Sequence, residues 1–320
     1  MCKSTTKLMN IVIVGQGAMG LLWYHHIQQL IKNSAKYNNA QLHLLTSNKY
    51  QHQYQYQQYT FTDHDSQTHR GTISYAQTKN INAADVIILC LKAFQISSVL
   101  KDISRALKHN ASVILAHNGM GTLTELPQSI SDTNNFYSLL TTHGCLRTAP
   151  LTITHTGVGS TDIGLLSGVN DLTQQQLLTT LLNTALPCVT YHKEIKQKQW
   201  LKLAINCVIN PLTALNNIEN GEINRIEYLP TITALLEELI AVANIEGIKL
   251  NLVALKQTVA NVAQTTAKNS SSMRCDVLAK RLSEIDYING YIHHLGIKHD
   301  IATPENTKMW QAVKNLEANT

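Results

Sequence analysis

The stretch IVIVGQGAMG, residues 11–20, decides the fold of this chain. With the residues from Leu8 onward, its β-branched first part predicts a short buried parallel strand that ends at Val14. The motif G-x-G-x-x-G follows, and apolar periodicity over 21–31 then predicts a helix. In such a turn the first glycine allows the bend, the second lets a pyrophosphate approach, and the third lets helix and strand pack closely. The predicted dinucleotide site is therefore Gly15, Gln16, Gly17, Ala18, Met19 and Gly20.

A second strand is predicted over 41–45, and the residues after it bear on the choice of cofactor. An NAD site usually has Asp or Glu there to hold the ribose 2′-hydroxyl, but this chain has Thr46-Ser47-Asn48-Lys49. Without a carboxylate nothing repels a 2′-phosphate, and Lys49 could attract one, so the pattern favours NADPH. The alternative is that Lys49 is an ordinary surface lysine. The polar, low-complexity segment 51–59 (QHQYQYQQY) is expected to be a variable loop or a poorly ordered edge.

The rest of the first half continues as an α/β pattern. Buried strands are predicted at 83–91 and 112–116, and polar loops that begin at Lys92 and His117 follow them. Ligands bind at the carboxyl ends of strands in doubly wound sheets, so both loops are candidate site loops. Further strands at 137–142, 151–155 and 160–166 are expected to close the sheet, and a helix is expected at 171–186. Together these elements predict a Rossmann-type dinucleotide-binding domain over residues 1–190.

The second half, residues 191–320, predicts an all-helical domain. Its helices are expected at 193–216, 229–247, 250–268, around 276–295 as one long helix, and 304–316. In the first of them, Lys202, Asn206 and Asn210 lie at i, i+4 and i+8 on one face. Pro211 follows directly, so a kink or a helix end is expected there.

This polar line has two interpretations. It could be the solvent face of a core helix, or it could bind a polar substrate against a semi-buried ammonium that acts as a general acid. Asparagine costs a helix roughly 0.7 kcal/mol relative to alanine, so two asparagines on one line favour the second interpretation.

Composition narrows the possible partners. The 320 residues are 44% hydrophobic and carry a formal charge of +5 without a Lys/Arg run, which suits an anionic small molecule rather than nucleic acid. The six cysteines are scattered, which is typical of reduced packing residues in a cytoplasmic protein. The 14 histidines lack metal-ligand spacing, so no metal is expected. No apolar run approaches the roughly 20 residues of a membrane helix, and the run at 11–14 is too short for a signal peptide.

Segments along nearly the whole chain resemble, in order, the ketopantoate reductase (2-dehydropantoate 2-reductase) family. They are IVIVGQGAMG (11–20), LKAFQ (91–95), AHNGMGT (116–122), WLKLAINCVINPLTA (200–214), ENGE (219–222), SSMRCD (271–276), SEIDYING (283–290) and IATPENT (301–307). The resemblance implies a Rossmann-type domain followed by a helical domain like the C-terminal domain of 6-phosphogluconate dehydrogenase. It also implies NADPH-dependent reduction of ketopantoate to (R)-pantoate, a step toward pantothenate and coenzyme A.

The resemblance also implies roles for individual residues. Lys202 would be the general acid at the carbonyl oxygen, and Glu284 would bind the substrate hydroxyl. The substrate-binding positions would be Asn118, Asn206, Asn210, Asn220 and Ser272, and cofactor contacts would include Lys92, Asn118 and Glu305. From the residues alone, Ser270–Ser272 would simply cap the next helix, and Glu284 would be a surface carboxylate.

The segment after the second strand differs from the family pattern, and other functions are compatible with the sequence. Family members often place an arginine after the second strand, where this chain has Ser47-Asn48-Lys49. The alternatives are a related NAD(P)-dependent dehydrogenase of 2-oxo or 3-hydroxy acids and a catalytically silent NADP(H)-binding sensor. The protein is expected to be a monomer or a homodimer, with no membrane or nucleic-acid partner.

Overall fold

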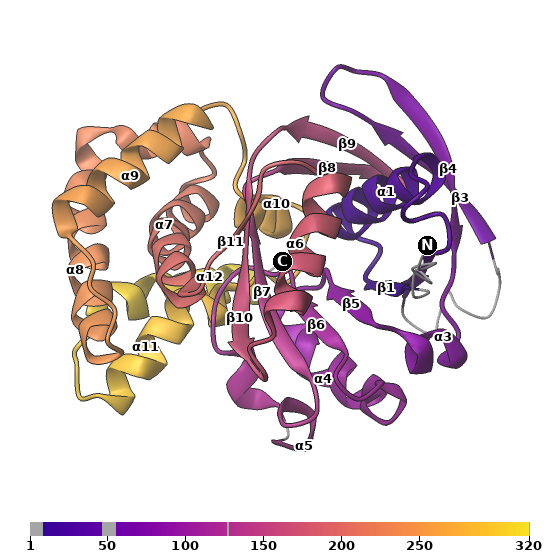
Figure 1. Cartoon of the computed structure of the whole chain (residues 1–320). Helices are drawn as coiled ribbons and strands as arrows, with labels where there is room; N and C mark the ends of the chain where they lie inside the picture. Colours follow the sequence, from indigo (N-terminus) through magenta and orange to yellow (C-terminus); the bar gives the residue numbers. More distant parts are fainter. Residues whose placement is uncertain (1–8, 47–55, 127, 320) are drawn as a thin grey trace. The chain divides into compact units, whose positions relative to one another are not determined.

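The computed structural model describes residues 9–46, 56–126 and 128–319 (Figure 1). The chain forms two compact units. The second unit consists of Lys92–Phe94, Asn118–Thr124 and the chain from Lys196 onward, and the first unit contains the other described residues. Each unit has its own hydrophobic core.

A sheet of 7 strands in the order β11-β10-β7-β6-β5-β1-β2 organises the first unit. All its neighbouring strands pair in parallel except β7 and β10, which are antiparallel. The strands are β1 (Asn10–Val14), β2 (Gln41–Leu45), β5 (Val86–Leu89), β6 (Ser112–Leu115), β7 (Asn135–Thr141), β10 (Thr161–Ser167) and β11 (Val189–Tyr191). Every residue of the apolar strand β5 is buried, as expected where helices cover both faces of a parallel sheet. The predicted α/β class is confirmed.

Helices connect these strands. They are α1 (Ala18–Asn33), α3 (Thr78–Ala83), α4 (Ala93–Ile103), α5 (Gln128–Ser131) and α6 (Leu172–Ala185), with short 3-10 helices η1 (Ser104–Ala106) and η2 (Thr122–Glu125). In α1 the residues Leu21, Trp23 and Ile27 are fully buried in the core of the unit. Asp171 caps α6, since its side chain accepts hydrogen bonds from the backbone N–H groups of Thr173 and Gln174.

A second sheet of 4 strands, in the order β4-β3-β9-β8, corrects two predictions. Its strands are β3 (Tyr56–Thr62), β4 (Thr68–Ser74), β8 (Gly144–Ala149) and β9 (Thr152–Gly157). The expected loop at 51–59 is wrong for its last residues, because β3 is an interior strand in which Tyr59 and Phe61 alternate inward, each 1% exposed. Residues 51–55 lie outside the described part of the chain. The strand expected at 151–155 exists as β9, but it pairs with β3 and β8 instead of closing the main sheet.

The second unit is helical. Its helices are α7 (Ile195–Asn216), α8 (Leu229–Ile245), α9 (Leu252–Thr265), α10 (Ser272–Leu278), α11 (Asn289–Lys298) and α12 (Pro304–Ala318), with η3 (Asn220–Asn224), η4 (Ile226–Tyr228) and η5 (Ile285–Tyr287). Figure 1 shows α7 among the other helices of this unit, and its Leu203, Cys207 and Val208 are at most 1% exposed in the core.

One helix prediction in this unit is wrong. The long helix expected around 276–295 is broken, because α10 ends at Leu278 and α11 begins only at Asn289. Lys280, with a φ of 53°, takes the left-handed conformation that ends a helix. Of the kink or helix end expected at Pro211, the end is absent, since α7 continues through the proline to Asn216. The predicted serine cap is confirmed, because Ser271 Oγ accepts a hydrogen bond from the N–H of Arg274.

Candidate functional site

The glycine loop after β1 has the shape that a dinucleotide pyrophosphate needs. Gly15 has a φ of +105°, and a Cβ there would lie 2.4 Å from the carbonyl oxygen of Cys90. A Cβ on Gly20 would lie 1.9 Å from the oxygen of Gly15, so helix and turn touch there. Gly17 is the N-cap of α1, and a Cβ on it would meet nothing within 4 Å. The loop therefore has open space beside the free N–H groups at the start of a 16-residue helix, where a phosphate fits.

The neighbouring side chains define the edge of this loop. The hydroxyl of Tyr75 lies 3.4 Å from Gln16 Oε1 and 2.7 Å from Gln57 Oε1. Tyr75 also forms a bridge to Leu44, one residue before the end of β2. Lys49, the candidate 2′-phosphate ligand, lies outside the described residues with Ser47 and Asn48.

In the second unit, α7 carries the predicted polar face. Lys202 and Asn206 are half-buried, and Asn210 is 6% exposed. Within the part of the chain that the structure describes, the amides of Asn206 and Asn210 make no hydrogen bond to another residue. Amides that are withdrawn from bulk water yet not used by the protein suit a polar ligand.

Glu284 is a buried anchor and not a surface carboxylate. It is 4% exposed. Its Oε1 accepts hydrogen bonds from the backbone N–H of Ala93 at 3.0 Å and of Asn118 at 3.3 Å, and the Asn118 amide donates to Oε2 at 3.3 Å. Met120 N–H also donates to the carbonyl oxygen of Tyr287 at 2.8 Å. The segments 92–94 and 118–124 are thus tied to the 284–287 turn within one unit.

Lys92 joins the carboxylate of Glu284 to that of Asp276, a residue for which the sequence predicted no role. Its Nζ makes a hydrogen-bonded ion pair with Asp276 Oδ2 and lies 3.8 Å from Glu284 Oε2. Asp276 is 4% exposed, and its other oxygen faces Arg281 Nε at 3.3 Å. The signal was present in the SSMRCD segment, since the aspartate lies one helical turn after the serines.

The remaining predicted site residues are distributed over the second unit. Asn220 is 8% exposed, donates to Thr266 Oγ1 at 3.0 Å, and has a buried Oδ1 without a partner among the described residues. Ser272 is exposed at the start of α10. Glu305 lies in the first turn of α12, where its carboxylate pairs with Lys308 at 3.3 Å. Neither the Asn220–Thr266 hydrogen bond nor the Glu305–Lys308 ion pair by itself points to a cofactor.

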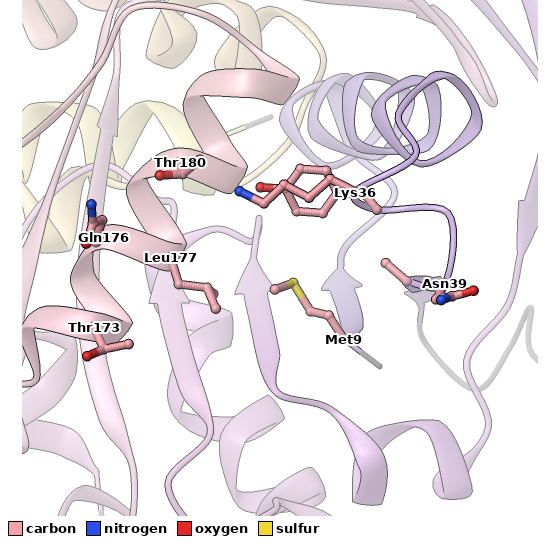
Figure 2. A pocket seen from close by; sticks show the side chains of 9 residues that line it. Met9, Lys36, Asn39, Thr173, Gln176, Leu177 and Thr180 are labelled. Atoms are coloured by element: carbon pink, nitrogen blue, oxygen red, sulfur yellow. The ribbon is translucent and has the colours of Figure 1, made fainter. Parts of the chain in front are cut away.

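A hollow of about 380 Å³ lies elsewhere in the first unit. Figure 2 shows the Lys36 side chain extending from the segment after α1 toward the lining residues of α6, with Met9 between the two segments. Met9 precedes β1, whereas the glycine loop follows β1. This hollow is therefore at the amino end of the strand, opposite the end at which dinucleotides bind.

Other kinds of site find little support in the described residues. No group of three or more His, Cys, Asp or Glu side chains among them could hold a metal ion. The cysteines at 90, 145, 188, 207 and 275 are free. No helix in the described ranges is long and apolar enough to cross a bilayer.

Comparison with known families decides the classification. The model of "Ketopantoate reductase PanE/ApbA" matches residues 11–168, and that of "Ketopantoate reductase PanE/ApbA C terminal" matches residues 194–317. The chain belongs to the ketopantoate reductase family. Among curated members, the 2-dehydropantoate 2-reductase of Vibrio cholerae is 35% identical over 312 residues, covering 97% of this chain and 98% of the relative. That of Yersinia pestis is 32% identical over 318 residues, covering 97% and 96%.

Solved structures share the fold of this ketopantoate reductase family member. A PanE/ApbA family ketopantoate reductase from Ralstonia eutropha has a TM-score of 0.83 at 21% identity, covering 97% of this chain and 99% of that one. A D-mandelate dehydrogenase with NADH and anilino(oxo)acetate has a TM-score of 0.84, also at 21% identity and with the same coverage. At these identities the likeness concerns the fold alone.

Proposed function

We propose that this chain reduces 2-dehydropantoate (ketopantoate) to (R)-pantoate with NADPH, as a step toward pantothenate and coenzyme A. The observation that carries the proposal is the 35% identity to a 2-dehydropantoate 2-reductase over 97% of the chain. The half-buried Lys202, on the same face of α7 as Asn206 and Asn210, gives the proposal a chemical basis.

In this proposal the glycine loop holds the cofactor. Gly15, Gln16, Gly17, Ala18, Met19 and Gly20 form the turn around the pyrophosphate, which the free N–H groups at the start of α1 would bind, whereas the Gly15 N–H donates to the Leu45 carbonyl. Lys49 is proposed for the 2′-phosphate, and Lys92, Asn118 and Glu305 for further cofactor contacts. When bound, NADPH supplies the hydride that reduces the ketone.

Lys202 is the proposed general acid. Its ammonium donates a hydrogen bond to the substrate carbonyl oxygen, where negative charge develops as the ketone is reduced, and then transfers a proton to that oxygen. Asn206, Asn210, Asn220 and Ser272 are proposed to bind the polar groups of the substrate. The amides of Asn206 and Asn210 support this role, because nothing else in the described chain engages them.

Glu284 is proposed to select the substrate by its hydroxyl group. A carboxylate has roughly four acceptor positions, and the contacts with Ala93 and Asn118 use two at Oε1 and one at Oε2. The position left at Oε2, which Lys92 Nζ faces at 3.8 Å without a hydrogen bond, suits a substrate hydroxyl. A 2-oxo acid without that hydroxyl would leave the buried carboxylate incompletely paired and would react more slowly.

The test is NADPH consumption by the purified protein with ketopantoate, compared with 2-oxoisovalerate, which lacks the hydroxymethyl group. We expect fast turnover of ketopantoate only. Lys202→Ala should lower kcat by at least about 100-fold, as expected for loss of a general acid. Lys196→Ala, an exposed lysine on the same helix, should have no effect.

Glu284→Gln should raise KM for ketopantoate and reduce the preference over 2-oxoisovalerate. Equal turnover of both acids would reject Glu284 as the specificity residue and favour a broader 2-oxo acid dehydrogenase. NADPH binding without turnover of either acid would contradict the proposal and favour a silent sensor.

We propose a domain division at residues 190 and 191, a monomer or homodimer, and a cytoplasmic location. The preference for NADPH over NADH rests on the absence of a carboxylate after β2.

A further inference from the structure

A buried chain of polar groups runs through the second unit and ends on the backbone of α7. Glu238 of α8 accepts from the Asn306 amide of α12 at 2.8 Å. Asn306 Oδ1 accepts from the Asn289 amide of α11 at 3.1 Å, and the same amide donates to the carbonyl oxygen of Cys207 at 3.0 Å. Asn289 and Asn306 are both 0% exposed.

Pro211 explains why this carbonyl needs a donor. In an α-helix the carbonyl of residue 207 normally accepts from the N–H of residue 211, but proline has no N–H. The helix nevertheless continues to Asn216. Cys207 is fully buried, so water cannot replace the missing donor, and the Asn289 amide supplies it.

The geometry fixes how the Asn289 amide is oriented. Both hydrogens of Nδ2 are used, one on Cys207 O and one on Asn306 Oδ1. Its Oδ1 is buried without a partner among the described residues, and a flipped amide would place oxygen against two acceptors.

Asn306 is held in turn. It donates to Leu235 O at 3.1 Å, and Glu238 also accepts from the backbone N–H groups of Glu305 and Asn306 at 2.8 and 2.9 Å. Residues of α8, α11 and α12 thus hold the Asn289 amide against the Cys207 carbonyl of α7.

The supported carbonyl lies beside two residues of the polar face of that helix. Cys207 is next to Asn206, and Pro211 is next to Asn210, so the interrupted turn adjoins the first amide and contains the second. Elsewhere on the same helix, Thr213 Oγ1 lies 2.7 Å from Ser271 Oγ, which caps α10 just before Ser272.

We propose that Asn289 is a positioning residue, which replaces the helical donor removed by Pro211 and so fixes the directions of Asn206 and Asn210 toward the substrate. This inference rests on the proposed function. Without the Asn289 donor, the turn 207–211 would shift to find another partner for the Cys207 carbonyl, and the two amides would shift with it.

A double-mutant cycle between Asn289→Ala and Pro211→Ala tests this inference. Asn289→Ala should raise KM for ketopantoate on the order of tenfold with a smaller change in kcat, because substrate binding is affected and Lys202 is not. In the Pro211→Ala background the N–H of residue 211 can bond to Cys207 O, so the same substitution should change KM little.

Asn306→Ala is the matched control. This substitution removes the other partner of the Asn289 amide and should lower the melting temperature. Pro211→Ala should not restore that melting temperature, because Asn306→Ala leaves the hydrogen bond between Asn289 and the Cys207 carbonyl in place. If Asn289→Ala alone does not fold, the double variant should fold, since its carbonyl has a donor again.

An unchanged KM in Asn289→Ala, an equal loss in both backgrounds, or failure of both variants to fold would overturn the inference. Failure of the wild-type protein to reduce ketopantoate would instead reject the proposed function, and with it the role of Asn289 in substrate binding. The coupling of Asn289 and Pro211 in thermal unfolding would still test the structural link by itself.

Discussion

At the scale of single residues, buried carboxylates hold the cations and backbone N–H groups of the candidate site. Asp276 and Glu284 are each 4% exposed, and both face Lys92. A buried charge is retained only with partners, so each of these groups restrains the others. Sequence reasoning can select such residue types, but it cannot tell which carboxylate faces which cation, because Lys92 and Asp276 are far apart in the chain.

Asp276→Asn should lower kcat/KM for ketopantoate by about tenfold, because a neutral amide attracts Lys92 more weakly and leaves its ammonium less well positioned. Arg281→Gln is the control. It removes the other cation that faces Asp276, but the Arg281 side chain is 53% exposed, so water weakens its attraction to the carboxylate. Steady-state kinetics of both variants measure the difference, and equal losses would show that Asp276 does not act through Lys92.

At the scale of elements, the sequence predicted what local periodicity determines. The parallel strands around the glycine motif and the α7 face with Lys202 were predicted correctly because their patterns are short-range. The pairing of β3 with β9 was missed because it joins residues about ninety positions apart. The break between α10 and α11 was missed because it depends on tertiary contacts of the turn, such as those of Glu284 with Ala93 and Asn118.

The glycine loop allows structure and cofactor binding to be separated by two similar substitutions. Gly20→Ala places a Cβ 1.9 Å from the Gly15 oxygen, so it should lower the melting temperature. Gly17→Ala places a Cβ in open space, so it should leave the melting temperature nearly unchanged but weaken NADPH binding. Thermal unfolding and NADPH fluorescence titration measure the two effects. Unchanged NADPH affinity in Gly17→Ala would contradict the assignment of this loop to the cofactor.

At the scale of the whole molecule, the first unit contains a cluster of histidine rings between α1 and the sheet of β3 and β9. His25 stacks on Phe61 with ring centroids 3.9 Å apart, His26 lies 6.0 Å from His155, and His155 lies 5.2 Å from His143. Burial, reinforced by neighbouring histidines, lowers the pKa of His25 to about 3 and the pKa values of His26 and His143 to about 4. The cluster is therefore neutral in the folded protein at neutral pH.

This burial should make stability depend on pH between about 3 and 6.5. The lowered pKa values mean that the unfolded chain, with histidine pKa values near 6.5, binds more protons than the folded chain in this window. Stability should therefore be fully present above pH 6.5 and fall as the pH falls. The charge of Asp63 raises the pKa of His25 and so opposes the effect of burial, whereas Lys32, His69 and His26 lower this pKa further.

The measurement is the melting temperature between pH 4 and 7 for the wild-type protein and two variants. His26→Phe removes one titrating ring, whose Nε2 is buried without a partner among the described residues. The melting temperature of this variant should therefore change less with pH than that of the wild type. His109→Gln changes an exposed histidine outside the cluster and should leave the curve as it is. Carboxylates also titrate near the lower end of this range, but they are the same in all three proteins, so a difference in slope reports on the histidine. Parallel curves for the wild type and His26→Phe would show that the cluster does not control acid stability.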